Sequence, residues 1–331
     1  MKRWSTKTPR IEVAAGPGRT GRAIFSFTDD FSVFHFSKMP DQIPGKGEVV
    51  ARMGHASLKA LECAGIHTHM IGFRPPRAME VRLVNVLDPA ERPLGPGDTA
   101  RLVPLQVIYR NRLGPGASVY RRAAAGRVTP ADLGLDVLPP PDAPLARPIL
   151  EFTTKLETID RFVREDEARA IAGLTPGQFE TLKAMTLEID AVLSRHAAAR
   201  GLVLADGKVE FALDEDGALM LVDVAGTPDE NRFVLDGIDV SKQILRDFYH
   251  GFGLEAEVQR LAAAGVPRPL WPSPPRLPPV LTAAVAELYR ALCERWTSVP
   301  VGATRTLEAA AAEAVGTLAR VAVQPVAAAI T

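Results

Sequence analysis

Two acidic residues interrupt the apolar arms of a short β-hairpin that the sequence predicts between residues 207 and 225. Glu210 lies in VEFAL and Asp223 in ALMLVDV, and the turn-like DEDG joins these segments. An acid among apolar neighbours is costly unless a cation meets it. Two carboxylates on facing strands could share one Mg²⁺, a cation that takes carboxylate and phosphate oxygens. The alternative is a hairpin whose acids face solvent on the outer side of the sheet, which is the commoner case for a hairpin taken alone.

The alternation of side chains along a strand assigns each acid to a face. In the first arm, Glu210 shares a face with Lys208. In the second arm, strict alternation places Asp223 with Leu219 and Leu221. Asp223 is thus expected on a face with apolar side chains, where burying its carboxylate costs free energy unless a cation pairs with it.

The composition indicates a globular protein with a substantial core. The chain has 331 residues, of which 47% are hydrophobic, and this length favours two or more lobes. Its formal net charge is zero, so electrostatics give no argument for nucleic acid or for an acidic membrane as a partner. No apolar run reaches the roughly 18 residues of a spanning helix, and we expect a cytoplasmic protein. Cys63 and Cys293 lie in apolar helical patterns, which predicts two buried free thiols.

The order of strand-like and helix-like segments predicts an α+β fold. Short β-like runs dominate a first lobe at residues 1–104, where AIFSF-TDD-FSVFHF is expected to form a hairpin. RLVPLQVIYRNRL is expected to be a single strand leaving that lobe. A central lobe at 105–264 mixes strands and helices, and residues 265–331 hold two Ala-rich helices.

Helices are predicted from periodicity and from capping residues. The cap-like Thr175-Pro176 precedes a long amphipathic helix, and the proline-rich segment LPPPDAPLARP is expected to be a surface loop. The other predicted helices are GEVVARMGHASLKALECAG, DRFVREDEARAIAG and SKQILRDFYHGF.

The segment VEFALDEDGALMLVDVAGTPDENRF resembles the signature of the SAICAR synthetase (phosphoribosylaminoimidazole-succinocarboxamide synthase) family. Other segments resemble the family in the same order: IPGKGEVVARMG, AGIHTHMIG, RLVPLQVIYRNRLGPGASVYRR, EFTTKLETID and VSKQILRDFY. The resemblance covers roughly residues 18 to 250. It implies a small β-rich lobe over a larger α+β lobe, with ATP in the cleft between them and C-terminal helices added.

The resemblance also implies a reaction. Family members join an aminoimidazole carboxylate ribonucleotide (CAIR) to L-aspartate with consumption of ATP, giving SAICAR, ADP and phosphate. A carboxylate is a poor electrophile, so transfer of the ATP γ-phosphoryl group to it would form an acyl phosphate that the amine attacks. Metal and cationic groups directed at the phosphates would then supply most of the catalysis.

Matching positions to the family motifs assigns roles to residues. The resemblance implies Mg²⁺ binding by Glu210 and Asp223, and catalysis by Lys155 and Asp223. It implies substrate binding by Arg110, Ser118, Asp229, Arg232 and Lys242, with Arg246 adding positive charge. It implies an ATP site formed by Arg22, Lys46, Leu102, Val103 and Lys155. The alternatives are ordinary surface cations at each of these basic positions, and a simple turn at GRTGRA, which carries Arg22.

Three departures from the family pattern leave the substrate open. Gln106, Val224 and His35 stand where the family has acids, which alters the charge expected around the substrates. The alternatives are therefore the same chemistry on another azole carboxylate nucleotide or amine, or a nucleotide-binding protein without turnover. His67 and His69 are expected to be structural. The expected partners are small molecules, without nucleic acid or membrane, and a homo-oligomer is possible.

Overall fold

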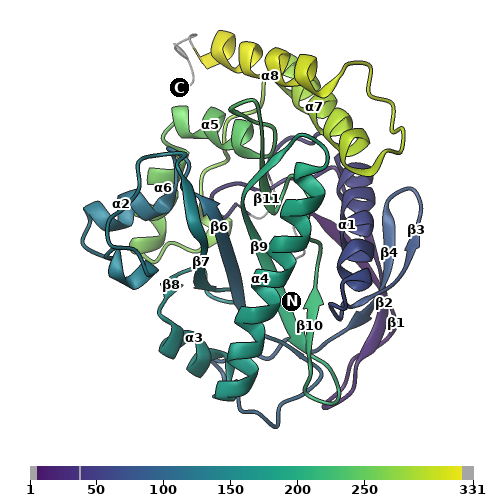
Figure 1. The fold of residues 1–331 in the computed structure, drawn as a ribbon, viewed down its shortest axis with the longest axis vertical. Helices are drawn as coiled ribbons and strands as arrows, with labels where there is room; N and C mark the ends of the chain where they lie inside the picture. Colours follow the sequence, from purple (N-terminus) through teal and green to yellow (C-terminus); the bar gives the residue numbers. More distant parts are fainter. Residues whose placement is uncertain (1–5, 37–38, 323–331) are drawn as a thin grey trace.

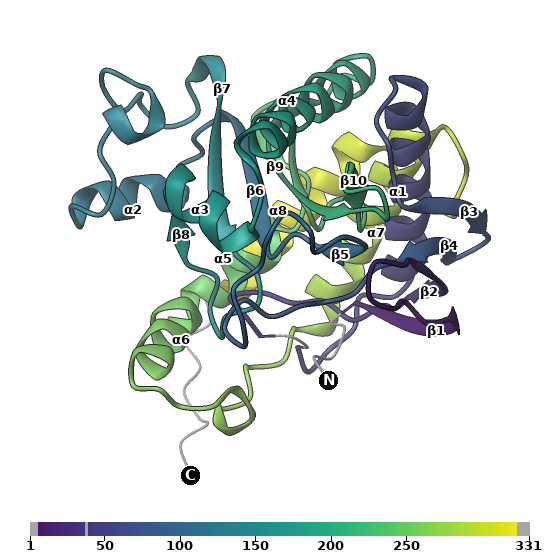
Figure 2. The same ribbon diagram turned by 90° about the horizontal axis from the view of Figure 1, so that it is seen from below.

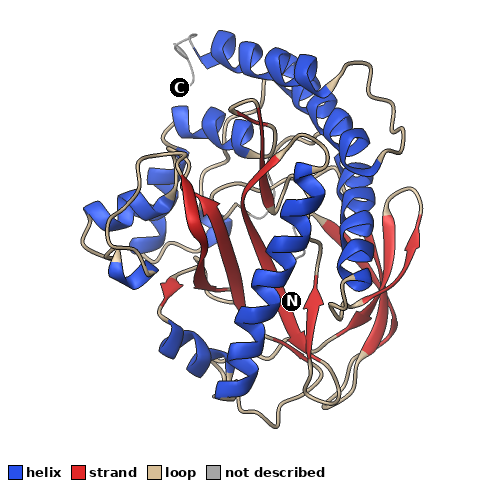
Figure 3. Cartoon of the chain, in the orientation of Figure 1, coloured by secondary structure: helices blue, strands red, loops and turns tan. Residues whose placement is uncertain are grey.

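A four-stranded antiparallel sheet forms the N-terminal part of the chain. The computed structural model describes residues 6–36 and 39–322, coloured by secondary structure in Figure 3. The sheet has the order β1-β2-β4-β3. Its strands are β1 (Lys7–Val13), β2 (Gly21–Phe27), β3 (Met70–Arg74) and β4 (Ala78–Leu83). The prediction of a β-rich N-terminal lobe is confirmed.

The predicted partner of β2 was wrong. The segment FSVFHF forms no strand, because Phe34 and His35 adopt left-handed backbone with φ values of 48° and 68°. The turn is closed by a hydrogen bond from the Phe36 N–H to the Val33 carbonyl. Strand β2 pairs instead with β4 and with β1, a strand that sequence patterns did not predict.

Helix α1 (Lys46–Cys63) begins in the predicted PGKG segment. Gly45 has φ 83°, which other residues rarely adopt, and a Cβ at Gly47 would lie 2.5 Å from the Phe27 carbonyl oxygen. The Asp29 carboxylate accepts hydrogen bonds from the N–H groups of both glycines. The two glycines therefore let the start of α1 approach the end of β2, which fixes where Lys46 lies.

The second sheet lies in the central part of the chain and has the order β12-β11-β9-β6-β7-β8, with β10 and β5 also paired to β9. Its strands are β5 (Arg101–Leu102), β6 (Leu105–Arg112), β7 (Pro144–Thr154), β8 (Phe162–Val163), β9 (Val203–Leu213), β10 (Leu219–Val222), β11 (Asn231–Leu235) and β12 (Ile238–Asp239). The hairpin predicted around the two acids is confirmed as β9 and β10.

Two details of the central strands differ from prediction. The strand expected from residue 101 onward is split into β5 and β6, because Pro104 has no N–H for a sheet and interrupts it. The proline-rich connector is a loop only in its first half, since β7 begins at Pro144 and carries the rest.

Helices pack against this sheet. In Figure 1, α4 crosses in front of β6 and β9, and its start has the capping box of Thr175 and Gln178. The helices after α1 are α2 (Ser118–Ala124), α3 (Glu165–Ala172), α4 (Pro176–Ala198), α5 (Gln243–Gly251), α6 (Leu254–Ala263), α7 (Pro279–Thr297) and α8 (Leu307–Ala322). The predicted helices are present, but the one predicted over residues 160–173 begins only at Glu165, because Phe162–Val163 forms β8. The α+β class is confirmed.

The C-terminal helices are built into the core. Helix α7 packs on α1, and α8 packs on α7 and α5. The indole of Trp296 in α7 donates to Ser57 of α1 at 3.0 Å and packs 4.8 Å from the ring of Phe233 in β11. A single hydrophobic cluster therefore joins the N-terminal, central and C-terminal segments.

The two thiols differ in burial. Both cysteines are free, and Cys293 is buried as predicted. The prediction for Cys63 was wrong, because it is the last residue of α1 and is exposed. Within the part of the chain that the structure describes, none of the helices has both the length and the hydropathy to span a bilayer.

Candidate active site

A cleft of about 2250 Å³ opens between the N-terminal sheet and the central sheet. Figure 2 shows the N-terminal strands on one side of β5 and β10, with the central strands on the other. Nine of the predicted site residues line the cleft: Leu102, Arg110, Ser118, Lys155, Glu210, Asp223, Asp229, Arg232 and Lys242. Three others, Arg22, Lys46 and Val103, are not part of its lining.

The two acids of the hairpin open onto this cleft. Glu210 of β9 stands opposite Val222 of β10, so these residues share a face. Alternation grouped Asp223 with Leu219 and Leu221, which in the observed register would turn it away from Glu210. The alternation does not hold at this residue, because Asp223 adopts left-handed backbone with φ 65° where β10 ends. The irregular backbone places the carboxyl of Asp223 in the cleft beside Glu210.

A lysine accompanies each of these acids. Lys155, which follows β7, forms an ion pair with Glu210, and the Gln106 amide donates to the same oxygen at 3.3 Å. Lys7 of β1 forms an ion pair with Asp223. Burial alone would raise the pKa of Asp223, but Lys7 and Lys155 outweigh it and hold this pKa at about 2. Asp223 is therefore ionised near neutral pH, and each of the two acids has a lysine as its partner.

Lys7 is a site residue that sequence reasoning missed. It lies in an N-terminal strand without apolar alternation, KTPRIEV, and no local motif marks it. The signal that could have found it was charge balance, since a buried acid in a hairpin requires a cation from elsewhere in the chain.

Two arginines of the cleft lining meet at Asp206 of β9, and a third, Arg246, lines the same cleft. Arg110 of β6 is buried and donates to Glu151 at 2.7 Å and to Asp206 at 3.2 Å. Arg232 of β11 donates to the same Asp206 oxygen at 3.1 Å. Burial next to Arg232 lowers the pKa of Arg246, which lines the cleft from α5. This concentration of guanidinium groups suits a phosphate or carboxylate ligand.

A buried lysine also faces this region. Burial lowers the pKa of Lys242 to about 8, although Asp229 favours its charged form. Burial opposes ionisation of Asp229, yet Lys242 and Lys46 lower the pKa of that carboxyl below its ordinary value. Lys46, predicted in the ATP site, has a fully buried side chain and reaches Asp229 at 2.6 Å. It thus holds a residue of the cleft wall and does not face the cleft.

Of two further predicted site residues, Ser118 lies at the cleft and Arg22 does not. Ser118, which was predicted to bind substrate, begins α2 and lines the cleft. Arg22 lies in β2, half exposed, and pairs with Glu12 at 3.1 Å and Glu80 at 3.6 Å. The structure does not bring its guanidinium to the cleft, because strand pairing holds it among these acids on the N-terminal sheet.

The linker between the sheets carries the predicted adenine contacts. Leu102 lines the cleft, and its N–H donates to the Asn85 carbonyl. Val103 is fully buried, and its N–H and carbonyl already bond to Phe211 and Leu105. The structure thus supports a cleft contact from Leu102 and not from Val103.

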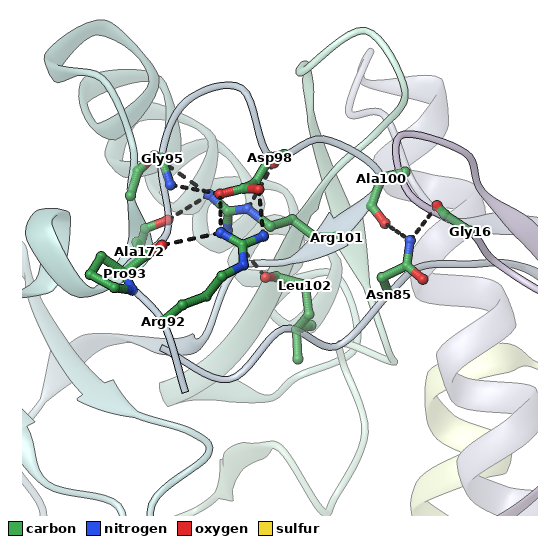
Figure 4. A network of polar contacts seen from close by, with 11 residues as sticks. Gly16, Asn85, Arg92, Pro93, Gly95, Asp98, Ala100, Arg101, Leu102 and Ala172 are labelled. Atoms are coloured by element: carbon green, nitrogen blue, oxygen red, sulfur yellow. Dashed lines mark hydrogen bonds and ion pairs between the residues drawn. The ribbon is translucent and has the colours of Figure 1, made fainter. Parts of the chain in front are cut away.

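A buried arginine anchors this linker. Arg101 is fully buried, and its guanidinium donates to the carbonyls of Asp98 at 2.7 Å and Ala172 at 2.7 Å, the latter at the end of α3 (Figure 4). A longer bond of 3.3 Å reaches the Leu102 carbonyl. The backbone of Leu102 is therefore tied to helix α3.

His67 and His69, which flank Thr68, were expected to be structural. His69 is buried, and its ring nitrogen Nε2 lies 3.1 Å from the Asp223 carbonyl oxygen. Burial lowers the pKa of His69 to about 4, so the ring is neutral near pH 7. His67 lies 3.7 Å from Asp214. Among the residues that the structure describes, no group of three or more His, Cys, Asp or Glu side chains could hold a metal.

A model of the family described as SAICAR synthetase matches residues 17–260. The chain belongs to the SAICAR synthetase family. A protein of Archaeoglobus fulgidus that provisionally bears the name phosphoribosylaminoimidazole-succinocarboxamide synthase is 38% identical over 302 residues, 86% of this chain and 90% of that protein. The enzyme of that name from Thermoplasma acidophilum is 33% identical over 281 residues, 83% of this chain and 92% of that protein.

Solved structures of the SAICAR synthetase family share the fold. A SAICAR synthetase in complex with ADP covers 91% of this chain with a TM-score of 0.62 and 21% identity. SAICAR synthase from Saccharomyces cerevisiae, complexed with SAICAR, also covers 91% of this chain, with a TM-score of 0.63 and 20% identity. The predicted fold and ligase class are confirmed, and the comparisons give no support to a different azole substrate.

The three departures from the family pattern lie in different surroundings. Val224 packs in the core against Gly54 of α1, so the charge of the cleft does not depend on this position. Gln106 lines the cleft and bonds Glu210, which keeps a neutral donor where an acid would add negative charge. His35 lines the cleft with its Nδ1 4.0 Å from Asp160, and burial lowers its pKa. Two of the three thus alter the cleft itself.

Proposed function

We propose that this cleft condenses an aminoimidazole carboxylate ribonucleotide with L-aspartate, using ATP and Mg²⁺. The observation that carries the proposal is that one cleft has both a pair of acids and several cations in its lining. Glu210 and Asp223 line the cleft with a lysine paired to each. Arg232 and Arg246 also line it, and Arg232 bonds Asp206, which precedes Glu210 by four residues in β9. Such a cleft can hold a metal–triphosphate and a phosphorylated acid at the same time.

The donor set of Glu210 and Asp223 fits Mg²⁺. Mg²⁺ in phosphoryl-transfer sites is commonly held by one or two protein carboxylates together with substrate phosphates, so a larger cluster of acids is not required. Glu210 and Asp223 would hold it, and when bound it would neutralise charge that develops on the phosphates. The side chains of these acids are 10% and 27% exposed, so their oxygens open onto the cleft.

The proposed reaction has two steps, and both move negative charge that a lysine of the cleft can compensate. The substrate carboxylate oxygen attacks the γ-phosphorus of ATP, which releases ADP and forms an acyl phosphate. The aspartate amine then attacks the acyl carbon, the C–O bond to phosphate breaks, and the nitrogen loses a proton. Lys155 lies beside Glu210 and is placed to compensate the negative charge that both steps move.

The cationic side chains of the cleft are suited to the ribonucleotide. We assign the 5′-phosphate to Arg232, with Lys242 and Arg246 adding positive charge. Asp206 orients Arg232, and the same carboxylate orients Arg110. Ser118 and Asp229 are assigned to polar groups of the substrate, both being in the lining of the cleft. Leu102 is assigned to the adenine of ATP.

The experiment is an assay of the purified chain with ATP, Mg²⁺, L-aspartate and CAIR. We expect ADP and SAICAR in equal amounts, and neither product when CAIR or L-aspartate is omitted. ADP release that is indifferent to CAIR would contradict the assignment of Arg232 to this substrate. Binding of nucleotide without turnover under every condition would contradict the reaction.

A further inference from the structure

The chain between β10 and β11 forms a turn, residues 226–231, that contributes to the wall of the cleft. Asp229 and Glu230 of this turn are in the lining of the cleft. The N–H groups of Glu230 and Asn231 both donate to the Thr227 carbonyl, at 3.2 and 2.9 Å, and these bonds close the turn. The position of the closed turn therefore sets where Asp229 meets the cleft.

Buried side chains hold the turn at its start and at its end. Gly226 has φ 69°, and a Cβ there would lie 2.1 Å from Oγ of Ser57 in α1, so glycine lets the backbone approach this close. The Asn231 side chain accepts from the Gly226 N–H at 2.7 Å and donates to the Tyr109 hydroxyl at 2.6 Å. Tyr109 and Asn231 each directly precede an arginine of the cleft lining.

The Ser57 hydroxyl has an orientation that is unusual inside a helix. Such hydroxyls commonly bond the carbonyl four residues earlier, as Thr186 of α4 does with Leu182 at 2.8 Å. Ser57 is fully buried in α1, yet its hydroxyl donates across to the Gly226 carbonyl at 3.5 Å. The indole N–H of Trp296 donates to the same Ser57 oxygen at 3.0 Å. The indole therefore keeps this hydroxyl on the side of α1 that faces the turn.

Trp296 is itself held by neighbouring elements. Its side chain is fully buried, with ring centroids 4.3 Å from His196 of α4 and 4.8 Å from Phe233 of β11. Its carbonyl oxygen accepts from Nε of Arg200 at 2.6 Å and lies 3.0 Å from Nε2 of His196. The residue belongs to α7, outside residues 17–260 that the family model matches. A C-terminal helix thus gives Ser57 and the turn a fixed support.

We propose that Trp296 is a positioning residue for binding of the substrate acid. Through Ser57 it places the 226–231 turn, and the turn places Asp229 against CAIR. The nucleotide is assigned to other elements, the linker at Leu102 and the hairpin acids, so its binding does not depend on this connection. The inference rests on the proposed function in one respect, the assignment of CAIR to Asp229 and its neighbours.

The experiment measures the Kd of CAIR and of ATP by calorimetry. Trp296→Phe keeps an aromatic ring and removes the N–H, which frees the Ser57 hydroxyl to bond the Met53 carbonyl in its own helix. We expect the Kd of CAIR to rise about fivefold, the value of one neutral hydrogen bond, with the Kd of ATP unchanged. Ser57→Ala should give the same loss, and the double variant should lose no more than either single variant. Additive losses, or equal weakening of ATP, would overturn the proposal.

Hydrogen exchange in the ligand-free protein tests the connection without CAIR. Exchange of the Asn231 N–H, which is bonded to the Thr227 carbonyl, should accelerate in Trp296→Phe and in Ser57→Ala. Thr186→Val removes an equally buried helix hydroxyl and, as the control, should change neither this exchange nor the affinity for CAIR.

The two readings separate the possible failures. If the wild type does not bind CAIR but exchange accelerates as expected, the proposed function fails and the placement of the turn by Trp296 stands. Wild-type exchange in both Trp296→Phe and Ser57→Ala would overturn that placement. Faster exchange with an unchanged Kd for CAIR would overturn the role of Trp296 in substrate binding. Ser57→Ala supplies each of these measurements if Trp296→Phe does not fold.

Discussion

Lys46 and Asp229 form an ion pair of 2.6 Å in which the side chains are 0% and 5% exposed. Lys46 begins α1, and Asp229 lies in the turn after β10. The pair thus joins the helix under the N-terminal sheet to the wall of the cleft. A lysine that sequence motifs assign to ATP instead holds an acid of the cleft wall in place.

Replacing Lys46 should destabilise the fold. Lys46→Met removes the nearer of the two lysines that pair with Asp229. The remaining one, Lys242, has its Nζ 3.8 Å from the Asp229 carboxylate. Breaking one partner of a buried pair costs about 3–5 kcal/mol in free energy of unfolding. Urea unfolding at neutral pH measures the loss. The exposed control Lys59→Met should change this free energy by no more than about 0.5 kcal/mol, and an equally small effect in Lys46→Met would contradict the role of the pair.

The limits of sequence reasoning are visible at this pair. PGKG correctly predicted the start of a helix, because glycine conformations and helix periodicity are local properties. Burial of Lys46 depends on Asp229, which is far away in the chain, and nothing in the local pattern reveals it. The same holds for Lys7, whose partner Asp223 is reached only after β1 pairs with β2.

For the hairpin that carries Glu210 and Asp223, the sequence predicted the strands correctly but not the direction of one side chain. The strands, the turn and the pairing of β9 with β10 followed from alternation and the DEDG turn. The face of Asp223 did not, because a left-handed residue ends the strand and period-two reasoning assumes regular backbone. Left-handed backbone is usually signalled by glycine or asparagine, and an aspartate at this position gives only a weak signal. The site could therefore be predicted as a set of residues more readily than as a geometry.

Lys242 should make substrate binding and stability depend on pH. Its pKa is about 8 in the folded protein, whereas a solvent-exposed lysine, as in the unfolded chain, has a pKa of 10.5. Between these values the unfolded chain binds the proton and the folded chain does not, so this residue makes the free energy of unfolding rise with pH across the window. In Lys242→Met that part of the rise should be absent from denaturant titrations. A slope identical to that of the wild type would show that Lys242 has an ordinary pKa.

The same lysine predicts proton uptake on ligand binding. A phosphate placed beside Lys242 favours its charged form, so binding CAIR above pH 8 should take up a proton. Calorimetry in two buffers of different ionisation enthalpy measures this uptake. The wild type should show it and Lys242→Met should show less. Equal uptake in the two proteins would place the phosphate elsewhere.

Arg232 should discriminate between the two substrates. Arg232→Ala removes a guanidinium group from the lining of the cleft, while Arg110 remains bonded to Asp206 and Glu151. We expect CAIR binding to weaken by about 2–3 kcal/mol, since a charged partner is left unpaired, with little change for ATP. The control Arg10→Ala removes an arginine that is 70% exposed. Titration calorimetry with each ligand gives the comparison, and equal weakening of CAIR and ATP would misplace Arg232.

Arg101 should affect the nucleotide through the backbone of the linker. Its guanidinium is buried among carbonyl oxygens of Asp98, Leu102 and Ala172, and within the described residues it forms no ion pair with an acid (Figure 4). Arg101→Met would leave these carbonyls unpaired, at a cost on the order of 1–3 kcal/mol for each buried group that water does not reach. The end of α3 and the linker would lose their connection.

The consequence is a specific change in kinetics. If the backbone at Leu102 contacts adenine, Arg101→Met should raise KM for ATP several-fold while KM for CAIR stays nearly constant. Hydrogen exchange at the Leu102 N–H, which is bonded to the Asn85 carbonyl, should accelerate in the same variant. Arg92→Ala removes a half-exposed arginine that bonds Asp98 from outside and serves as the control. A variant that is less stable but keeps the wild-type KM for ATP would show that Arg101 supports the fold alone, because a purely structural loss lowers the amount of active protein without changing affinity for one substrate.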